Sequence, residues 1–128
     1  MKYVLLILSL LFLANLQSYS QDFKASNSEE RKVLKLINAL PEVVRENNFR
    51  KKSHYKLFLG AYIQNRPDKE RSYYQVSTSE NLGFQLRTYD WYEVDPKTWT
   101  IRYEDIVTGK TISLKEWRKR LARNHKKT

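Results

Sequence analysis

Residues 89–105 read YDWYEVDPKTWTIRYED, and this stretch decides the fold because it contains two strands and the turn between them. Asp95 and Pro96 suit the first two positions of a type I turn, so the chain is expected to reverse here. The strand before the turn is predicted over residues 84–94, with room for a bulge, and the strand after it over residues 99–107. Alternation of aromatic and charged side chains is typical of strands whose two faces meet different surroundings.

A symmetric turn sorts the side chains of this hairpin onto two faces. One face is interpreted as core and contains three opposed pairs: Asp90 with Tyr103, Tyr92 with Ile101, and Val94 with Trp99. The other face is polar, and it places Arg102 where its guanidinium can stack on Trp91. A three-residue loop with a bulge would instead shift the register by one residue and exchange the faces on one strand. With the symmetric register, the candidate ligand-binding residues are Tyr89, Trp91 and Arg102.

A helical pattern precedes the strands. Apolar side chains recur at helical spacing from residue 29, and Ser26 and Glu29 have the spacing of a capping box. Pro41 lies inside this pattern and is expected to kink the helix or to begin a second, short one, which ends at Asn47–Asn48.

Two further strands and a final helix complete the expected architecture. Two-residue alternation predicts strands over residues 55–64 and 72–79. Ser113 and Glu116 form a second capping box, and Trp117 is expected to dock the short basic helix that follows. The fold class is therefore α+β: an N-terminal helix, kinked or broken at Pro41, packs on a four-stranded antiparallel sheet, with a short basic C-terminal helix.

The central turn also carries a resemblance to a known group of small domains. Val94–Thr98 reads VDPKT after an aromatic-rich strand, which resembles the v-D-p-x-T-G hairpin of PepSY-like and cystatin-like exported domains. The resemblance covers residues 29–107 and implies an N-terminal helix on a four-stranded antiparallel sheet. Trp99 stands where that hairpin has Gly. The chain lacks the Gln-x-Val-x-Gly inhibitory motif of cystatins, so the resemblance implies no site residues and argues against protease inhibition of that type.

The first twenty residues have the layout of a secretory signal peptide, with Lys2 before an apolar run and small polar residues after it. The run is eleven residues long and spans about 17 Å as a helix, too short for a hydrocarbon core of about 30 Å. We expect cleavage between Ser20 and Gln21 and export to the periplasm or the exterior, without a transmembrane segment; a retained anchor is the alternative. The expected division is a signal peptide (1–20), a flexible lead (21–28), one α+β domain (29–124) and a basic tail (125–128).

Few residue types in the chain suit catalysis or metal binding. It has no Cys, which removes thiol catalysis, disulfides and Cys-based metal sites, and its two histidines, His54 and His125, lie far apart in sequence. Three glycines are too few for a phosphate-binding loop and a dinucleotide fingerprint. We expect no catalytic residue, no cofactor and no metal. Acid–base chemistry would have to use Glu93 with Asp95, or Glu104 with Asp105, but the turn already explains Asp95 and a solvated strand face explains Glu104.

Positive charge concentrates at the C-terminus. The chain has a formal net charge of +10, and residues 115–128 hold seven Lys and Arg side chains against one Glu. Such a patch can attract a polyanion or anionic lipid headgroups, although a solubilising terminus is the alternative, and export argues against nucleic acid as the partner. The candidate residues for an anionic surface are Arg118, Lys119, Arg120, Arg123, Lys126 and Lys127.

Together these features favour an exported, non-catalytic binding or interaction module whose partner is an unidentified protein or envelope component. Aromatic side chains could stack against that partner from an exposed sheet face, or pack beneath a helix instead: Tyr62, Tyr74, Tyr89 and Trp91. Electrostatic attachment to an anionic envelope surface or polyanion through the C-terminal helix is the alternative function, and an uncharacterised hydrolase is the third.

Overall fold

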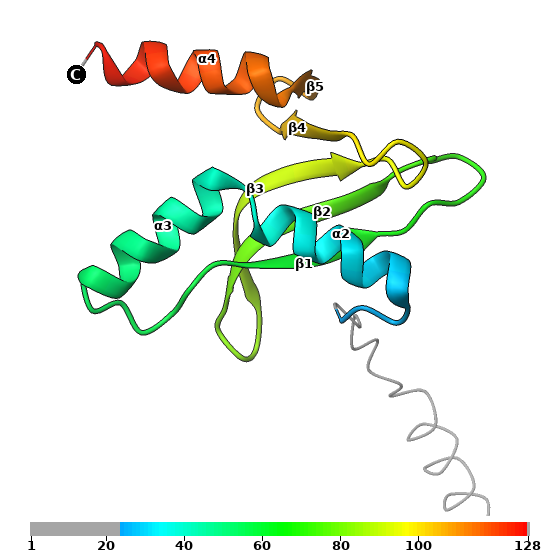
Figure 1. The fold of residues 1–128 in the computed structure, drawn as a ribbon, viewed down its shortest axis with the longest axis horizontal. Helices are drawn as coiled ribbons and strands as arrows, with labels where there is room; N and C mark the ends of the chain where they lie inside the picture. Colours follow the sequence, from blue (N-terminus) through cyan, green and yellow to red (C-terminus); the bar gives the residue numbers. More distant parts are fainter. Residues whose placement is uncertain (1–23, 128) are drawn as a thin grey trace, which may run out of the picture.

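The computed structural model describes residues 24–127, so the expected signal peptide lies outside the described residues. Within this range the chain forms one five-stranded antiparallel sheet in sequential order, β1-β2-β3-β4-β5, together with three helices (Figure 1). The α+β class is confirmed, whereas the expected number of four strands is wrong. The elements are α2 (Ser28–Asn38), α3 (Pro41–Lys52), β1 (Gly60–Asn65), β2 (Tyr74–Asn81), β3 (Leu86–Val94), β4 (Ile101–Asp105), β5 (Lys110–Ser113) and α4 (Leu114–His125).

The N-terminal cap of helix α2 lies one residue later in the sequence than expected. Asn27 is the N-cap and accepts a hydrogen bond from the backbone N–H of Glu30, whose carboxylate in turn accepts from the backbone N–H of Ser26. The predicted pair of Ser26 with Glu29 is therefore wrong by one residue. Glu30 also lies beside Arg66, and the hydrogen bond from Arg66 outweighs burial and lowers the pKa of Glu30 to about 2.

Helix α2 ends at Asn38 and Pro41 begins α3, a position that its missing N–H and fixed φ favour. Helix α3 runs to Lys52, beyond the predicted end at Asn48. The reason is that the amide of Asn47 does not cap the helix but bonds the backbone of Leu59, donating to its carbonyl at 3.0 Å and accepting from its N–H at 2.8 Å. The chain before Leu59, predicted as strand from residue 55, is thereby held as an exposed link and β1 starts only at Gly60.

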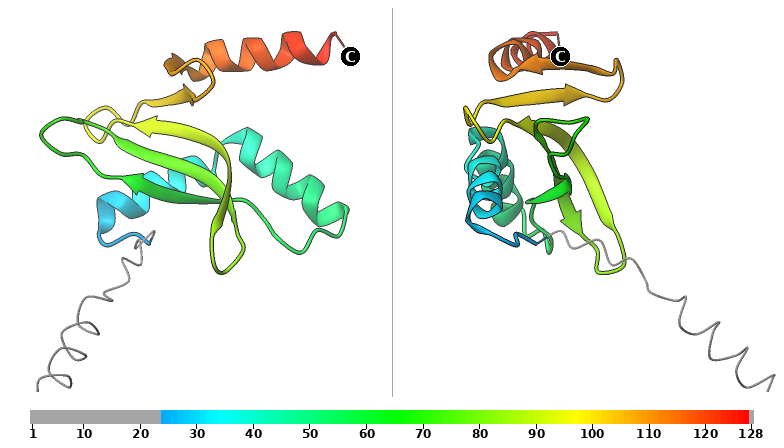
Figure 2. Two further views of the ribbon diagram at one scale, coloured as in Figure 1. Left: turned by 180° about the vertical axis from the view of Figure 1, so that it is seen from behind. Right: turned by 90° about the vertical axis from the view of Figure 1, so that its right-hand side faces the viewer.

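Both N-terminal helices cover the same face of the sheet (Figure 2). Val33 and Ile37 of α2 share one core with buried side chains of the first three strands, and this core also includes Leu40 and Val43 around the start of α3. Helix α4 packs against β4 and β5. Its Trp117 is buried, as expected, and it stacks on Tyr103 with ring centroids 4.4 Å apart.

The β3–β4 hairpin has a wider loop than the symmetric turn predicted. Tyr92 pairs with Tyr103 and Val94 with Ile101, so the register is shifted by two residues. Asp95 accepts hydrogen bonds from the N–H groups of the next turn, and Trp99 closes the loop in the left-handed region with φ 59°. Because the shift is even and side chains alternate with a period of two, the predicted core face is retained.

The fifth strand is the element that sequence patterns missed. The strand after the central turn was predicted to run to residue 107, but the chain reverses earlier, where the Asp105 side chain accepts from the N–H groups of Val107 and Thr108. Gly109, at φ 68°, then leads into β5, which pairs with β4 over four residues. A strand this short has too few residues to show alternation by itself.

Candidate functional site

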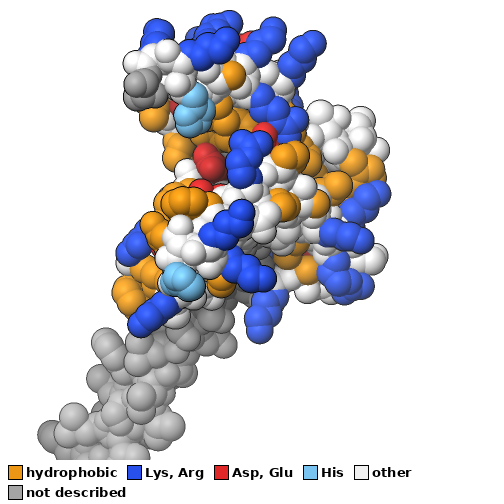
Figure 3. Space-filling model, turned by 60° about the vertical axis from the view of Figure 1, so that its left-hand side comes forward, with side chains coloured by type: hydrophobic (Ala, Val, Ile, Leu, Met, Phe, Trp, Pro, Cys, Tyr) orange, Lys and Arg blue, Asp and Glu red, His pale blue; other side chains and the backbone are white. Residues whose placement is uncertain are grey.

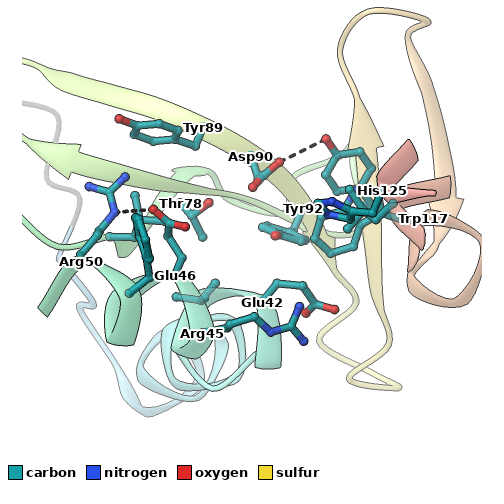
Figure 4. A pocket seen from close by; sticks show the side chains of 15 residues that line it. Glu42, Arg45, Glu46, Arg50, Thr78, Tyr89, Asp90, Tyr92, Trp117 and His125 are labelled. Atoms are coloured by element: carbon teal, nitrogen blue, oxygen red, sulfur yellow. Dashed lines mark hydrogen bonds and ion pairs between the residues drawn. The ribbon is translucent and has the colours of Figure 1, made fainter. Parts of the chain in front are cut away.

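A cavity of about 600 Å³ lies between α3, α4 and the helix-covered face of β2, β3 and β4. Val43 and Phe49 line it from α3, Trp117 and Leu121 from α4, and Tyr103 from β4. Figure 4 draws the lining side chains, with Trp117, Asp90 and Tyr92 among those labelled. Figure 3 shows hydrophobic and acidic side chains in the hollow between α4, at the top of the molecule, and the body below it. The volume is within the range of small-molecule sites, and the aromatic lining is typical of them.

A β-bulge in β3 brings two neighbouring polar residues, Tyr89 and Asp90, to the cavity. Thr78 pairs with Asp90 and Ser79 with Thr88, so Tyr89 has no opposite residue in β2. A bulge of this kind re-aims side chains, and here Tyr89 and Asp90, although adjacent in sequence, both line the cavity. The bulge that the sequence allowed within residues 84–94 is thus present, and it lies at the site.

Two buried hydroxyls that line the cavity lack hydrogen-bond partners among residues 24–127: Thr78 Oγ1 and Tyr92 Oη. Both side chains have 0% exposure and come from the sheet. An unpaired buried hydroxyl costs about 1–3 kcal/mol, so native chains satisfy nearly all such groups. Both hydroxyls lie in the wall of one cavity, and almost none of the surface of either oxygen is exposed.

Asp90 is a half-buried carboxylate whose one side-chain hydrogen bond in the described chain comes from Tyr103, which donates to Oδ1 at 3.2 Å. Burial raises the pKa of Asp90, the bond from Tyr103 opposes the rise, and the nearby charge of Glu42 adds to it. Burial and Asp90 in turn raise the pKa of Tyr103 to about 12, so its hydroxyl remains a donor at neutral pH. Burial and the charge of Asp90 also raise the pKa of Tyr92 above its usual range.

The other acidic residues at the cavity are engaged in ion pairs. Glu46 and the buried Glu80 both contact Arg50, and Glu46 is 2.8 Å from the Arg50 Nε atom. Burial disfavours the charged guanidinium, but hydrogen bonds to Glu80, Tyr89 and Glu46 raise the pKa of Arg50. Glu42 on α3 accepts from Arg118 on α4 at 2.6 Å, which ties the two walls of the cavity together. Asp90 is therefore the cavity carboxylate without an ion pair within residues 24–127.

Only one of the three predicted ligand-binding residues lies at this site. Trp91 and Arg102 are on the opposite face of the sheet, where Trp91 pairs with Glu104 and Arg102 with Glu93. The expected stacking of Arg102 on Trp91 is wrong because the two-residue register shift separates them, and Arg102 instead donates to the Thr111 carbonyl at 3.4 Å. Tyr89 was expected on their face, but the bulge turns it to the cavity.

Sequence reasoning missed Thr78, Asp90, Tyr92 and Tyr103 as site residues because it assigned the hairpin members of this group to the core. One signal was present in the sequence. An acidic side chain on a predicted core face, opposite a tyrosine, is out of place in a purely apolar interior. Of the other aromatics considered for an exposed sheet face, Tyr74 is buried beneath α2 and donates to Glu29 at 2.5 Å, while Tyr62 is half-buried.

The six basic residues proposed for an anionic surface, on α4 and directly after it, divide into two sets. Arg118 pairs with Glu42, and Arg120 pairs with Glu116 at 3.4 Å and with Asp105 at 3.6 Å. The other four candidate residues are exposed and have no side-chain partner in the part of the chain that the structure describes: Lys119, Arg123, Lys126 and Lys127.

Within residues 24–127 no group of three or more His, Asp and Glu side chains is arranged to hold a metal ion. The same residues contain no helix with the length and apolar character needed to cross a bilayer. Comparison of the chain with protein-family models, with curated proteins and with solved structures gives no significant match.

Proposed function

We propose that this chain is an exported, non-catalytic binding domain that holds a small ligand in the cavity between α3, α4 and the sheet. The observation that carries the proposal is the pair of buried, unpartnered hydroxyls of Thr78 and Tyr92 in an aromatic cavity of about 600 Å³. A ligand that hydrogen-bonds both would recover the free energy that their burial costs the unliganded protein. The N-terminal signal pattern supports export.

Binding accounts for the polar groups of the cavity better than hydrolysis does. A glycosidase-type mechanism needs two carboxylates free to exchange protons with the substrate. Glu42 and Glu46 are each held by an arginine, which leaves Asp90 as a single such group. Hydroxyls beside one carboxylate suffice to orient a ligand, whereas they supply no general acid–base pair.

A small-molecule screen on the purified protein tests the proposal. Binding is followed by ¹H–¹⁵N chemical shifts and by the fluorescence of Trp117, which lines the cavity. Leu121→Trp should fill the cavity from α4 and abolish binding. The matched control is Leu114→Trp, since Leu114 is also half-buried on α4 but does not line the cavity. Ligands that bind Leu121→Trp as well as the wild type would show that the cavity is not the site.

Attachment to an anionic surface is the second candidate function, favoured by four exposed basic residues without side-chain partners in the described chain: Lys119 and Arg123 on α4, and Lys126 and Lys127 directly after it. The test is cosedimentation with phosphatidylglycerol vesicles at low and raised salt. Replacement of Lys119, Arg123, Lys126 and Lys127 by Gln leaves the ion pairs of Arg118 and Arg120 intact and should reduce retention. Retention that depends neither on these substitutions nor on salt would exclude an electrostatic role for them.

A further inference from the structure

We propose that the ligand of this cavity is an organic amine in its cationic form, with an aromatic or similarly flat apolar body. The inference rests on the proposed binding function and specifies the chemistry that the cavity selects. The juxtaposition that carries it is a carboxylate without an ion pair, two hydroxyls able to accept hydrogen bonds, and several aromatic rings, all lining one cavity (Figure 4).

The first step concerns charge. Asp90 has no cationic side chain bonded to it within residues 24–127, and the charged group that acts on it most is the acidic Glu42. The same cavity is also lined by Tyr103 from β4, by Glu46, Arg45 and Arg50 from α3, and by His125 from α4, and Arg118 of α4 bonds Glu42 in its wall. Arg118 and Arg50 are committed to carboxylates of the chain, and Arg45 lies beside Glu42 in Figure 4.

This arrangement discriminates between three classes of ligand. An anionic ligand placed at Asp90 would add a like charge where burial already disfavours charge. A neutral ligand would leave the carboxylate without compensation. A cationic amine satisfies it. The hydroxyl oxygens of Thr78 and Tyr92, which have no partner in the described chain, lie in the wall of the same cavity and are acceptors by type.

The second step concerns the rings. Trp117 stacks on Tyr103 at 4.4 Å between centroids, and both approach Tyr92 edge-on at 5.8 Å. Ring faces attract cations, and aromatic surfaces beside a carboxylate are the usual way in which proteins recognise alkylammonium groups. Tyr89, at the same cavity, already has the Arg50 guanidinium 5.2 Å from its ring centroid. The flat rings also favour a flat apolar body on the ligand.

The experiment compares molecules of one shape and three charges. The probes are phenethylamine, 2-phenylethanol and phenylacetate, with tryptamine, tryptophol and indole-3-acetate as a larger set. Affinities are measured by ¹H–¹⁵N titration at neutral pH. We expect each amine to bind at least about tenfold more tightly than its alcohol and the acid to bind most weakly, because one charge–charge contact in a partly buried site is worth this much or more.

Asp90→Asn is the decisive variant, since its amide oxygen can still accept the Tyr103 hydrogen bond while the charge is removed. The preference for amine over alcohol should then disappear. Glu70→Gln, which removes one exposed carboxylate on the β1–β2 turn, is the matched control and should keep the preference.

The outcomes separate this inference from the proposed function. Equal binding of amine and alcohol, with both lost in Leu121→Trp, would overturn the amine inference and leave the binding function standing. An amine preference that persists in Asp90→Asn would equally overturn it. If no probe of either set shifts the resonances of cavity residues, the binding function falls and the amine inference with it.

Discussion

Replacement of Thr78 by Val should stabilise the unliganded protein, although Thr78 is buried in a central strand. Its side chain has 0% exposure, and its hydroxyl has no partner within residues 24–127. Val has the same branched shape and is at least as well suited to a strand, so the substitution removes an unpaired hydroxyl at little packing cost. Most core substitutions destabilise a protein, so the expected sign is itself a stringent test.

The magnitude follows from the cost of the unpaired group. Burial of a hydroxyl without a hydrogen bond costs about 1–3 kcal/mol, and partial relaxation around the cavity lowers the recoverable part to about 1 kcal/mol. For a domain of this size, about 1 kcal/mol corresponds to a rise in Tm of about 4–8 °C. Urea denaturation and calorimetry of the two proteins, without ligand, measure both quantities.

Thr88→Val is the matched control. Thr88 lies on the neighbouring strand β3, and its hydroxyl shares a hydrogen bond of 3.0 Å with the Ser79 hydroxyl. The same chemical change should therefore destabilise the protein there by about 0.5–1.5 kcal/mol. If Thr78→Val lowers stability as much as Thr88→Val does, the Thr78 hydroxyl is satisfied in solution and the reasoning that marks this cavity as a ligand site is wrong.

Three further predictions concern the contacts that hold the elements together. Tyr74→Phe removes the hydrogen bond to Glu29 and should destabilise the protein by about 1.5–3 kcal/mol, as bonds to charged groups do, measured by urea denaturation. Because the folded pKa of Glu30 is about 2 and its ordinary value is 4.5, its stabilising contribution should be complete above pH 4.5 and be lost as the pH falls toward 2. Screening at Arg66, which is 43% exposed, reduces this contribution to about 1–2 kcal/mol, and Glu30→Gln should flatten the pH dependence of the urea midpoint over that interval. Trp117→Ala should cost about 3–5 kcal/mol and release α4, seen as faster amide exchange in α4 while exchange in α2 stays slow; equal acceleration in both helices would contradict the separate docking of α4.

The β3–β4 hairpin shows why the sequence could predict which face of the sheet each side chain lies on, but not which residues of the two strands pair. The alternation of aromatic and polar residues determines which side chains of β3 and β4 face the core, and this survives any even shift. Loop length depends on backbone conformation at one residue. Trp99 adopts a left-handed φ of 59°, which glycine adopts at least cost, and it is stabilised there by partial burial and by the Lys32 ammonium 3.9 Å from its ring centroid. Lys32 is 67 positions away, so nothing local to the turn indicates this contact.

The location of the site could not be predicted either, because it too depends on how two strands pair. A bulge adds one residue without altering the composition of a strand, and its position in β3 depends on pairing with β2, so Tyr89 could not be placed from its own strand. The face opposite the helices retains Trp91 and Arg102 as predicted, and their role in binding a partner stays a prediction. The fifth strand is too short to produce a pattern and depends on its pairing with β4.

The cavity and the core share the same strand, which constrains how the site can change. On β3, Val94 and Tyr92 have 0% exposure and pack in the core, and within two residues the strand reaches Asp90 and then the bulge. Sequence patterns identify the core residues of β3 correctly as far as Tyr92. The next residue on the same face is the charged Asp90, and the cavity begins there. Departures of this kind are expected where a chain gives up stability for binding. The prediction for Thr78→Val expresses the same relation in measurable form: the substitution that stabilises the free protein should be the one that weakens its hold on a ligand.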